Sequence, residues 1–171
     1  MRLEGDAWQE FFDTFKHSAF RLETRAVYTM PGERDTYQRF LNGEAPTGGH
    51  AAEWTEKVRN YRATGRTVGR VHVVTRPLSE YLRYEFAWWY RFNTAAGEDI
   101  RILDLTDKPN PGLPEYDFWM FDDSQIVKMM YRDDGTQIGR ELLEDADPSE
   151  YIRYRDIAVS SSVPFAEYVA D

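Results

Sequence analysis

Hydrophobic residues in the first third of the chain alternate between helical and strand spacing. Residues 6–15 place Trp8, Phe11, Phe12 and Phe15 at helical intervals, which predicts a short amphipathic helix. The segment 19–30 begins with strand-like alternation at Phe20, Leu22 and Thr24. Two further helical patterns follow at 34–41 and 51–64, separated by the flexible, glycine-rich loop 42–50.

The next part predicts a strand, a long helix and a second strand. The apolar run at Val71, Val73 and Val74 predicts a strand at 67–75 that is buried on both faces. Pro77 is placed where a helix of about five turns begins, and this helix ends before Gly97. A strand at 99–105 follows, so we expect a parallel crossover.

The remainder predicts a hairpin and a final helix. A proline-rich loop at 106–116 precedes strands at 117–121 and 125–132, and 136–144 suggests a further antiparallel strand. Asp147, Pro148 and Glu150 have the spacing of a helix N-terminus, and this helix is expected to reach about Val159.

The predicted fold class is therefore α/β (α+β), with one mixed central sheet flanked by helices. We expect a single domain over 1–171, in which an N-terminal segment (1–65) packs on an α/β core (66–171). The chain of 171 residues is 42% hydrophobic and 15% aromatic, which is enough to build one full core.

Composition limits the location and the chemistry. The sequence has no cysteine, which excludes disulfides, thiol nucleophiles and thiolate zinc sites. It shows neither the apolar core of a signal peptide nor an apolar run long enough for a membrane span, so we expect a cytoplasmic protein without a membrane partner.

Charge is distributed unevenly along the chain. The net charge is -9, and residues 97–171 hold 18 acids against 7 bases. This balance argues against direct nucleic-acid binding, because phosphate contacts need lysine and arginine. The segment 57–91 nevertheless holds eight bases and two acids, so a local basic face remains possible.

Specific catalytic and metal-binding motifs are missing from the sequence. His17, His50 and His72 have no partner at metal-ligand spacing, so we predict no metal site and no cofactor. No serine lies in a nucleophile elbow, and the glycines at 47–49 lack the lysine of a phosphate-binding loop.

Aspartates gather at the two predicted hairpin turns, with Asp122 and Asp123 at one turn and Asp133 and Asp134 at the other. Aspartate favours turns because its side chain bonds the nearby backbone. We interpret Asp122 as the corner of a turn, and retain it as a candidate binding residue because a cation site is the alternative.

The helix after Pro77 carries two aromatic stripes. The first consists of Leu78, Leu82, Phe86 and Trp89, and the second of Tyr81, Tyr84, Trp88 and Arg91. Either the helix is almost fully buried, or the second stripe is a binding surface, since tyrosine, tryptophan and arginine dominate contact energies. The candidate binding residues are Arg76, Tyr81, Tyr84, Trp88, Arg91 and Asp122.

Three stretches carry a family resemblance over nearly the whole chain: "FKHSAFRLETRAVY", "RVHVVTRPLSEYLRYEF" and "DFWMFDDSQIVKMMYRDDG". They resemble an uncharacterised family of actinobacterial domains of unknown function, whose genes lie beside those of helix-turn-helix regulators. The resemblance implies a regulatory protein partner.

The order of strand, long helix, strand, hairpin and C-terminal helix is also similar to phospholipase D-like domains. Active members carry H-x-K-x4-D. Here Val74 follows His72 where the lysine would stand, and Ser79 takes the place of the aspartate. The similarity therefore implies a version without phosphodiester transfer.

Our leading hypothesis is a non-enzymatic, cytoplasmic binding or regulatory domain. It would act with a partner such as a helix-turn-helix transcriptional regulator, associate with itself, or sense a small ligand. One alternative is a phosphoesterase or nucleotide-acting enzyme that uses the arginine-rich segment 57–91. Another is single-stranded nucleic-acid binding, with Tyr84 and Trp88 as stacking platforms.

Overall fold

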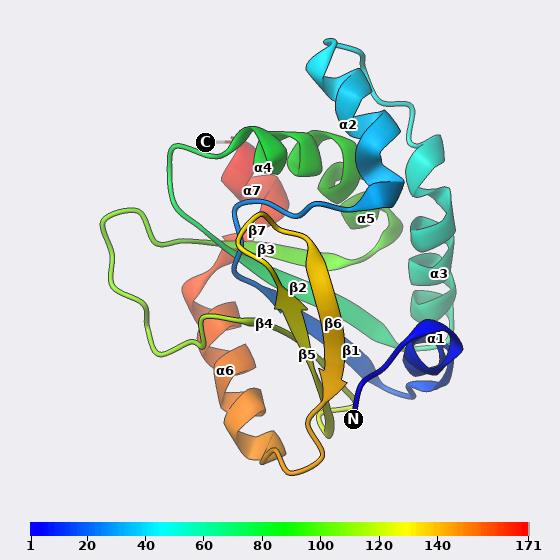
Figure 1. Ribbon diagram of the computed structural model, residues 1–171, viewed down its shortest axis with the longest axis vertical. Helices are drawn as coiled ribbons and strands as arrows, with labels where there is room; N and C mark the ends of the chain where they lie inside the picture. Colours follow the sequence, from blue (N-terminus) through cyan, green and yellow to red (C-terminus); the bar gives the residue numbers. More distant parts are fainter. Residues whose placement is uncertain (171) are drawn as a thin grey trace.

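The computed structural model describes residues 1–170, and Asp171, at the end of the predicted domain 1–171, lies outside them. One mixed sheet has the strand order β6-β5-β4-β1-β2-β3-β7 (Figure 1). The strands are β1 (Ser18–Glu23), β2 (Thr67–Val74), β3 (Asp99–Asp104), β4 (Asp117–Phe121), β5 (Gln125–Tyr131), β6 (Gln137–Leu142) and β7 (Val163–Pro164). The helices are α1 (Gly5–Thr14), α2 (Arg34–Leu41), α3 (Ala52–Ala63), α4 (Glu80–Glu85), α5 (Arg91–Ala96), α6 (Pro148–Ser161) and α7 (Phe165–Ala170).

Strand pairing confirms the expected mixed sheet. β2 and β3 run parallel, as the strand–helix–strand pattern predicts, and β1 also runs parallel to β2. β4, β5 and β6 form the predicted antiparallel meander. β1 comes from the N-terminal segment 1–65 and lies in the middle of the sheet, between β4 and β2. The N-terminal segment therefore supplies a central strand of the sheet as well as helices that pack on it.

The two faces of the sheet differ in chemistry. One face is apolar and packs against α6 through residues such as Leu22, Val71 and Phe118. The opposite face is covered by α1, α3 and the helix that contains α4 and α5 (Figure 1). Side chains alternate along a strand, so the neighbours of Leu22 and Val71 in sequence point to this second face. Several residues of the second face are charged, among them Arg21, Glu23 and Arg70.

The long helix begins later than the sequence suggests. It starts at Glu80 rather than at Pro77, because the Ser79 hydroxyl oxygen accepts a hydrogen bond from the Leu82 backbone N–H at 3.1 Å. A π-helical turn, Phe86–Tyr90, joins α4 to α5, and the helix ends at Gly97 in a left-handed conformation (φ 113°). This helix is referred to below as the α4–α5 helix.

The final helix begins where the sequence predicts. Asp147 caps it by accepting a hydrogen bond from the Ser149 N–H at 3.0 Å, and the helix runs to Ser161 rather than Val159. Within residues 1–170, the structure has no helix with the length and apolar character needed to cross a membrane.

Candidate functional site

A cavity of about 450 Å³ lies between the charged face of the sheet and the helices that cover it. Aromatic side chains form its walls: Trp8, Phe12, Trp54, Tyr81, Trp89 and Trp119. Charged side chains of the central strands form its floor. Two of its lining residues are exposed to solvent: Met30, at 38%, and Gly32. A volume of this size is typical of small-molecule sites.

The charged floor comes from alternate positions of the two central strands. Arg21 and Glu23 lie on β1, and Arg70 and His72 lie beside them on β2. The register sets Arg21 opposite Arg70 and Glu23 opposite His72. Two neighbouring guanidinium groups repel each other in a buried place, so this arrangement requires compensating carboxylates.

Glu98 and Glu23 supply two of these carboxylates to Arg70. Glu98 receives two hydrogen bonds from the guanidinium fork of Arg70, from Nε and, at 3.2 Å, from Nη2. Arg70 Nη1 donates to Glu23 at 2.9 Å. Burial would raise the pKa of Glu23, but the charges of Arg21 and Arg70 hold it well below the usual range.

Asp117 supplies the carboxylate for Arg21. It is 1% exposed and accepts hydrogen bonds from the Thr24 N–H at 2.8 Å and the Tyr28 hydroxyl at 2.6 Å. Arg21 Nη2 lies 3.4 Å from Asp117 and donates to the Tyr131 hydroxyl at 2.9 Å. Asp117 thus joins the loop after β1 to the sheet and positions Arg21.

His72 lies at the centre of this polar network, and its hydrogen bonds fit a doubly protonated ring. Tyr90 donates its hydroxyl proton to Glu23 at 2.8 Å, so the Tyr90 oxygen is free to accept from His72 Nδ1 at 2.8 Å. His72 Nε2 lies 2.7 Å from the Arg25 carbonyl, which can only accept. Burial would lower the pKa of His72, but the negative charges of Glu23 and Glu85 raise it to about 9.

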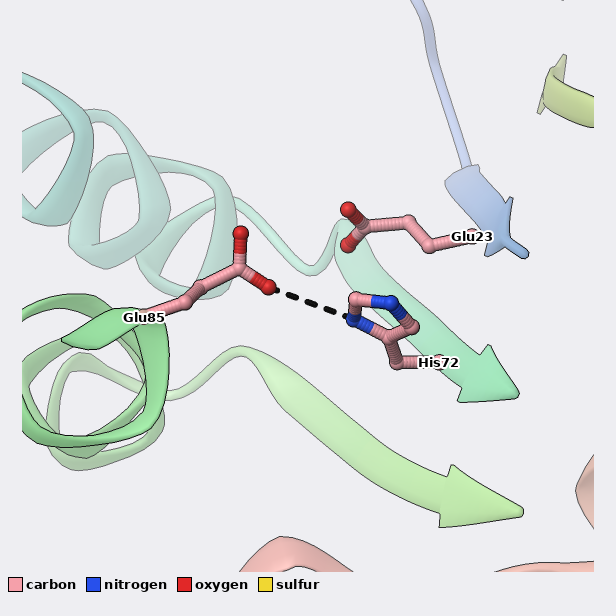
Figure 2. Close-up of side chains that lie close together, drawn as sticks. All are labelled: Glu23, His72 and Glu85. Atoms are coloured by element: carbon pink, nitrogen blue, oxygen red, sulfur yellow. Dashed lines mark ion pairs between the residues drawn. The ribbon is translucent and has the colours of Figure 1, made fainter. Parts of the chain in front are cut away.

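Glu23, His72 and Glu85 lie close together, as a metal site would require (Figure 2). Their potential ligand atoms are all within 4.8 Å of one another. A metal needs a ring nitrogen with a free lone pair, but both His72 nitrogens face acceptors. Glu23 also accepts from Arg70 and Tyr90. The hydrogen bonds fit an imidazolium between carboxylates better than a metal ion.

A further carboxyl group, that of Glu33, also lines the cavity. It accepts a hydrogen bond from the Tyr81 hydroxyl at 2.9 Å. Burial and the negative charge of Glu85 raise the pKa of Glu33 to about 7. The carboxyl groups of Glu33 and Glu85 therefore lie close enough for the charge of one to disfavour ionisation of the other.

Several residues that line the cavity carry a buried polar atom without a hydrogen-bond partner. Across residues 1–170, the buried side-chain atoms without one are Arg21 Nε, Glu85 Oε1, Asn93 Oδ1, Thr94 Oγ1 and Arg140 Nε. Glu85 Oε1 lies 3.2 Å from His72 Nδ1, as an ion pair without hydrogen-bond geometry, because that N–H is directed at Tyr90. All of these residues except Thr94 line the cavity.

The structure places only one of the six sequence-predicted residues, Tyr81, in this cavity. Tyr84 and Trp88 are 0% and 1% exposed. The Tyr84 hydroxyl contacts the Thr36 hydroxyl at 2.7 Å and accepts from Trp89 Nε1 at 2.7 Å. The three aromatic residues of the second stripe are thus part of the core, which agrees with the first of the two alternatives and not with a binding surface.

Arg76, Arg91 and Asp122 lie outside the cavity. Arg76 is exposed and donates to the Tyr168 hydroxyl at 2.9 Å, and Arg91 is exposed as well. Asp122 accepts backbone hydrogen bonds from Lys16 at 2.9 Å, His17 at 2.6 Å and Ser18 at 3.1 Å. Its carboxylate thus joins the segment between α1 and β1 to the β4–β5 hairpin. Burial would raise the pKa of Asp122, but the three N–H groups lower it below its usual value.

Sequence reasoning missed the floor of the cavity. Glu23, His72 and Glu85 come from three separate elements, so no local spacing joins them. One local signal exists: Arg21 and Glu23, like Arg70 and His72, are polar at every second position of strands that are otherwise apolar. Such charged alternation in central strands indicates a buried polar surface.

A family model described as "Domain of unknown function (DUF6879)" matches residues 6–170. No curated protein shows significant similarity to the sequence. The match spans nearly the whole chain, including every element that forms the cavity. The chain belongs to the DUF6879 family of domains of unknown function.

Proposed function

We propose that the protein is a non-catalytic binding domain that takes a small ligand into the aromatic cavity. The observation that carries the proposal is that four residues lining one cavity each hold a buried polar atom without a hydrogen-bond partner: Arg21 Nε, Glu85 Oε1, Asn93 Oδ1 and Arg140 Nε. Buried polar groups in proteins are nearly always hydrogen-bonded, so a site with four unpaired atoms is suited to a polar ligand. The aromatic walls supply apolar contact area for its body.

A binding role suits the polar floor better than catalysis. His72 is 0% exposed and both of its nitrogens face acceptors, so neither is free to take a proton from a substrate. Glu23 is held by Arg70 and Tyr90. These contacts also support the non-catalytic version of a phospholipase D-like domain that the sequence resemblance implies.

We further propose that a protein partner detects the ligand, in the cytoplasm of an actinobacterium. The family resemblance implies a helix-turn-helix regulator as this partner. The segment 25–33 connects the cavity to the surface: Tyr28 lines the cavity, and Val27 and Met30 on either side are 39% and 38% exposed. A partner that contacts these two side chains would respond to the position of Tyr28.

The test is a thermal-shift screen with a panel of amino acids, nucleosides, sugars and polyamines. Wild type is compared with Gly32→Trp, because Gly32 is an exposed residue that lines the cavity and has open space around its Cβ position. Lys108→Trp, on an exposed loop away from the cavity, is the control.

We expect at least one compound to raise the melting temperature of wild type and of Lys108→Trp, but not of Gly32→Trp. If no compound stabilises wild type, the proposed function is wrong. If a compound stabilises Gly32→Trp as strongly as wild type, it binds elsewhere, and the cavity is not the site.

A further inference from the structure

The four unpaired atoms belong to residues that line the cavity, and they divide by chemistry and by place. Two are acceptors, Glu85 Oε1 and Asn93 Oδ1, and both belong to the α4–α5 helix. Two are donors, Arg21 Nε and Arg140 Nε, and both belong to the sheet. Glu85 and Asn93 are 6% and 3% exposed, so little water reaches them. A ligand that satisfies all four must donate toward the helix and accept toward the sheet.

The helix side of the cavity lacks positive charge. In the buried network, four carboxylates (Glu23, Glu85, Glu98 and Asp117) face three cations (Arg21, Arg70 and His72). Both N–H groups of His72 are used elsewhere, which leaves Glu85 with an ion pair but no donor. Glu33 adds a carboxyl to the lining of the cavity, and its raised pKa reflects burial beside the charge of Glu85.

On the sheet side, the carboxylates of Glu23 and Asp117 pair with Arg21 and Arg70, and Arg140 is left without a carboxylate partner in the described part of the chain. Arg140 lies over the Trp8 ring, 5.1 Å from its centroid, and among residues 1–170 it forms no ion pair. Burial lowers the pKa of its guanidinium, and the charge of Arg21 acts in the same direction. A guanidinium in this setting gains most from a carboxylate, which matches its planar pair of donors.

We infer, on the basis of the proposed function, that the ligand is a small zwitterion. Its cationic end is an ammonium or amidinium whose N–H groups donate to Glu85 and Asn93. Its anionic end is a carboxylate that accepts from Arg140. The apolar part of the ligand packs between the aromatic walls, where Tyr81 and Trp89 also favour a positive charge over their ring faces.

The experiment uses four probes that share one flat ring and differ in charge: 4-amidinobenzoate, benzamidine, benzoate and benzamide. Their affinities for the full chain are measured by isothermal titration calorimetry. Glu85→Gln removes one negative charge with little change of shape, and Arg140→Gln removes the positive charge at the other end. The matched controls are Glu80→Gln and Arg132→Gln, both exposed and outside the cavity.

For wild type we expect 4-amidinobenzoate to bind most tightly, followed by benzamidine, with benzoate and benzamide weaker. Glu85→Gln should weaken both amidinium probes by at least about 10-fold, as the loss of a charged hydrogen bond implies. Arg140→Gln should weaken 4-amidinobenzoate by about 10-fold and leave benzamidine unchanged. The controls should match wild type.

Three results would overturn the inference: benzamide binding as well as 4-amidinobenzoate, benzoate binding better than benzamidine, or no binding by any probe. Each leaves the proposed function to be decided separately by the broader screen with Gly32→Trp. If Glu85→Gln fails to fold, Arg140→Gln still decides, because Arg140 is only half-buried at the edge of the cavity. An Arg140→Gln protein that binds 4-amidinobenzoate as wild type does also overturns it.

Discussion

His72 holds a positive charge in a place from which water is excluded. The charge is stabilised by Glu23 and Glu85 and by hydrogen bonds to Tyr90 and the Arg25 carbonyl. The unfolded chain offers none of these contacts. Protonation of this one side chain is therefore coupled to folding.

We expect the free energy of unfolding to fall as the pH rises from about 6.5 to 9. The pKa of His72 is raised from 6.5 to about 9 in the folded protein, so its stabilising contribution is fully present below 6.5 and lost as the pH passes 9. The loss is on the order of 3 kcal/mol. Urea unfolding at several pH values measures it.

His72→Gln should remove most of this slope between pH 7 and 9, while both proteins keep whatever slope comes from other groups. Glu33 has its pKa raised from 4.5 to about 7, so its effect on the free energy of unfolding falls mainly below pH 7. This effect is the same in wild type and in His72→Gln. Equal slopes for wild type and His72→Gln would show that His72 is not the titrating group.

At the hairpin corner, Asp122→Ala should lower the free energy of unfolding by about 2 kcal/mol, since three backbone N–H groups lose their acceptor. Asp122→Asn keeps one acceptor oxygen and tolerates the left-handed backbone (φ 53°), so its loss should be smaller. Urea unfolding compares them. If both variants lose equally, the hydrogen bonds to the carboxylate are not what stabilises the corner.

The segment between β1 and α2 reaches the cavity because the turn between β5 and β6 holds it. Thr29 N–H donates to the Gly135 carbonyl at 3.0 Å, and the Thr29 hydroxyl donates to the Asp134 backbone carbonyl at 2.7 Å. Arg25 Nη2 donates to the Asp133 carbonyl at 2.8 Å. These contacts position Tyr28 at the wall of the cavity.

Gly135→Ala should destabilise the protein by about 3 kcal/mol and weaken ligand binding. Gly135 has a φ of 90°, and a Cβ there would lie 2.7 Å from the Val27 carbonyl oxygen. Gly112→Ala is the matched control: its φ is 111°, but nothing lies within 4 Å, so strain alone costs about 1 kcal/mol. Equal losses would mean that the close approach to Val27 does not matter.

Most elements follow from local patterns, since helical spacing and β-branched runs act within a few residues. The predicted start of the α4–α5 helix at Pro77 is wrong by three residues. Proline favours the first helical turn, but the Ser79 side chain caps the helix by accepting from the Leu82 N–H, and this cap sets the start at Glu80. Tyr84 and Trp88 are contacted by Thr36 and His50, which reach them through tertiary contacts that no local pattern contains.

At the scale of the whole molecule, the two faces of the sheet have different roles: one packs in the apolar core, and the other lines the proposed binding cavity. The α6 face of the sheet is apolar, and its other face carries the polar floor of the cavity. Leu22 and Glu23 are neighbours in β1 that point to opposite faces. The cavity could not be predicted from the sequence, because its floor needs the register of β1 against β2, and β1 is paired with a strand far along the chain.

Leu22→Ala should lower the free energy of unfolding by about 3 kcal/mol and leave ligand affinity unchanged, because Leu22 is 0% exposed on the α6 face. Glu23→Gln should lower both stability and affinity, since Arg21 and Arg70 lose a partner charge beneath the cavity. Urea unfolding and calorimetry measure the two effects. A change in affinity for Leu22→Ala would contradict this difference between the two faces.

The central position of β1 has a consequence for synthesis of the chain. β1 is synthesised before the other strands of this sheet, and its antiparallel neighbour β4 is made only about 100 residues later. At roughly 5–20 residues per second, one edge of β1 stays unpaired for on the order of 5–20 s. During that time the nascent chain exposes Phe20, Leu22 and an open strand edge, so it is open to strand pairing between chains on neighbouring ribosomes.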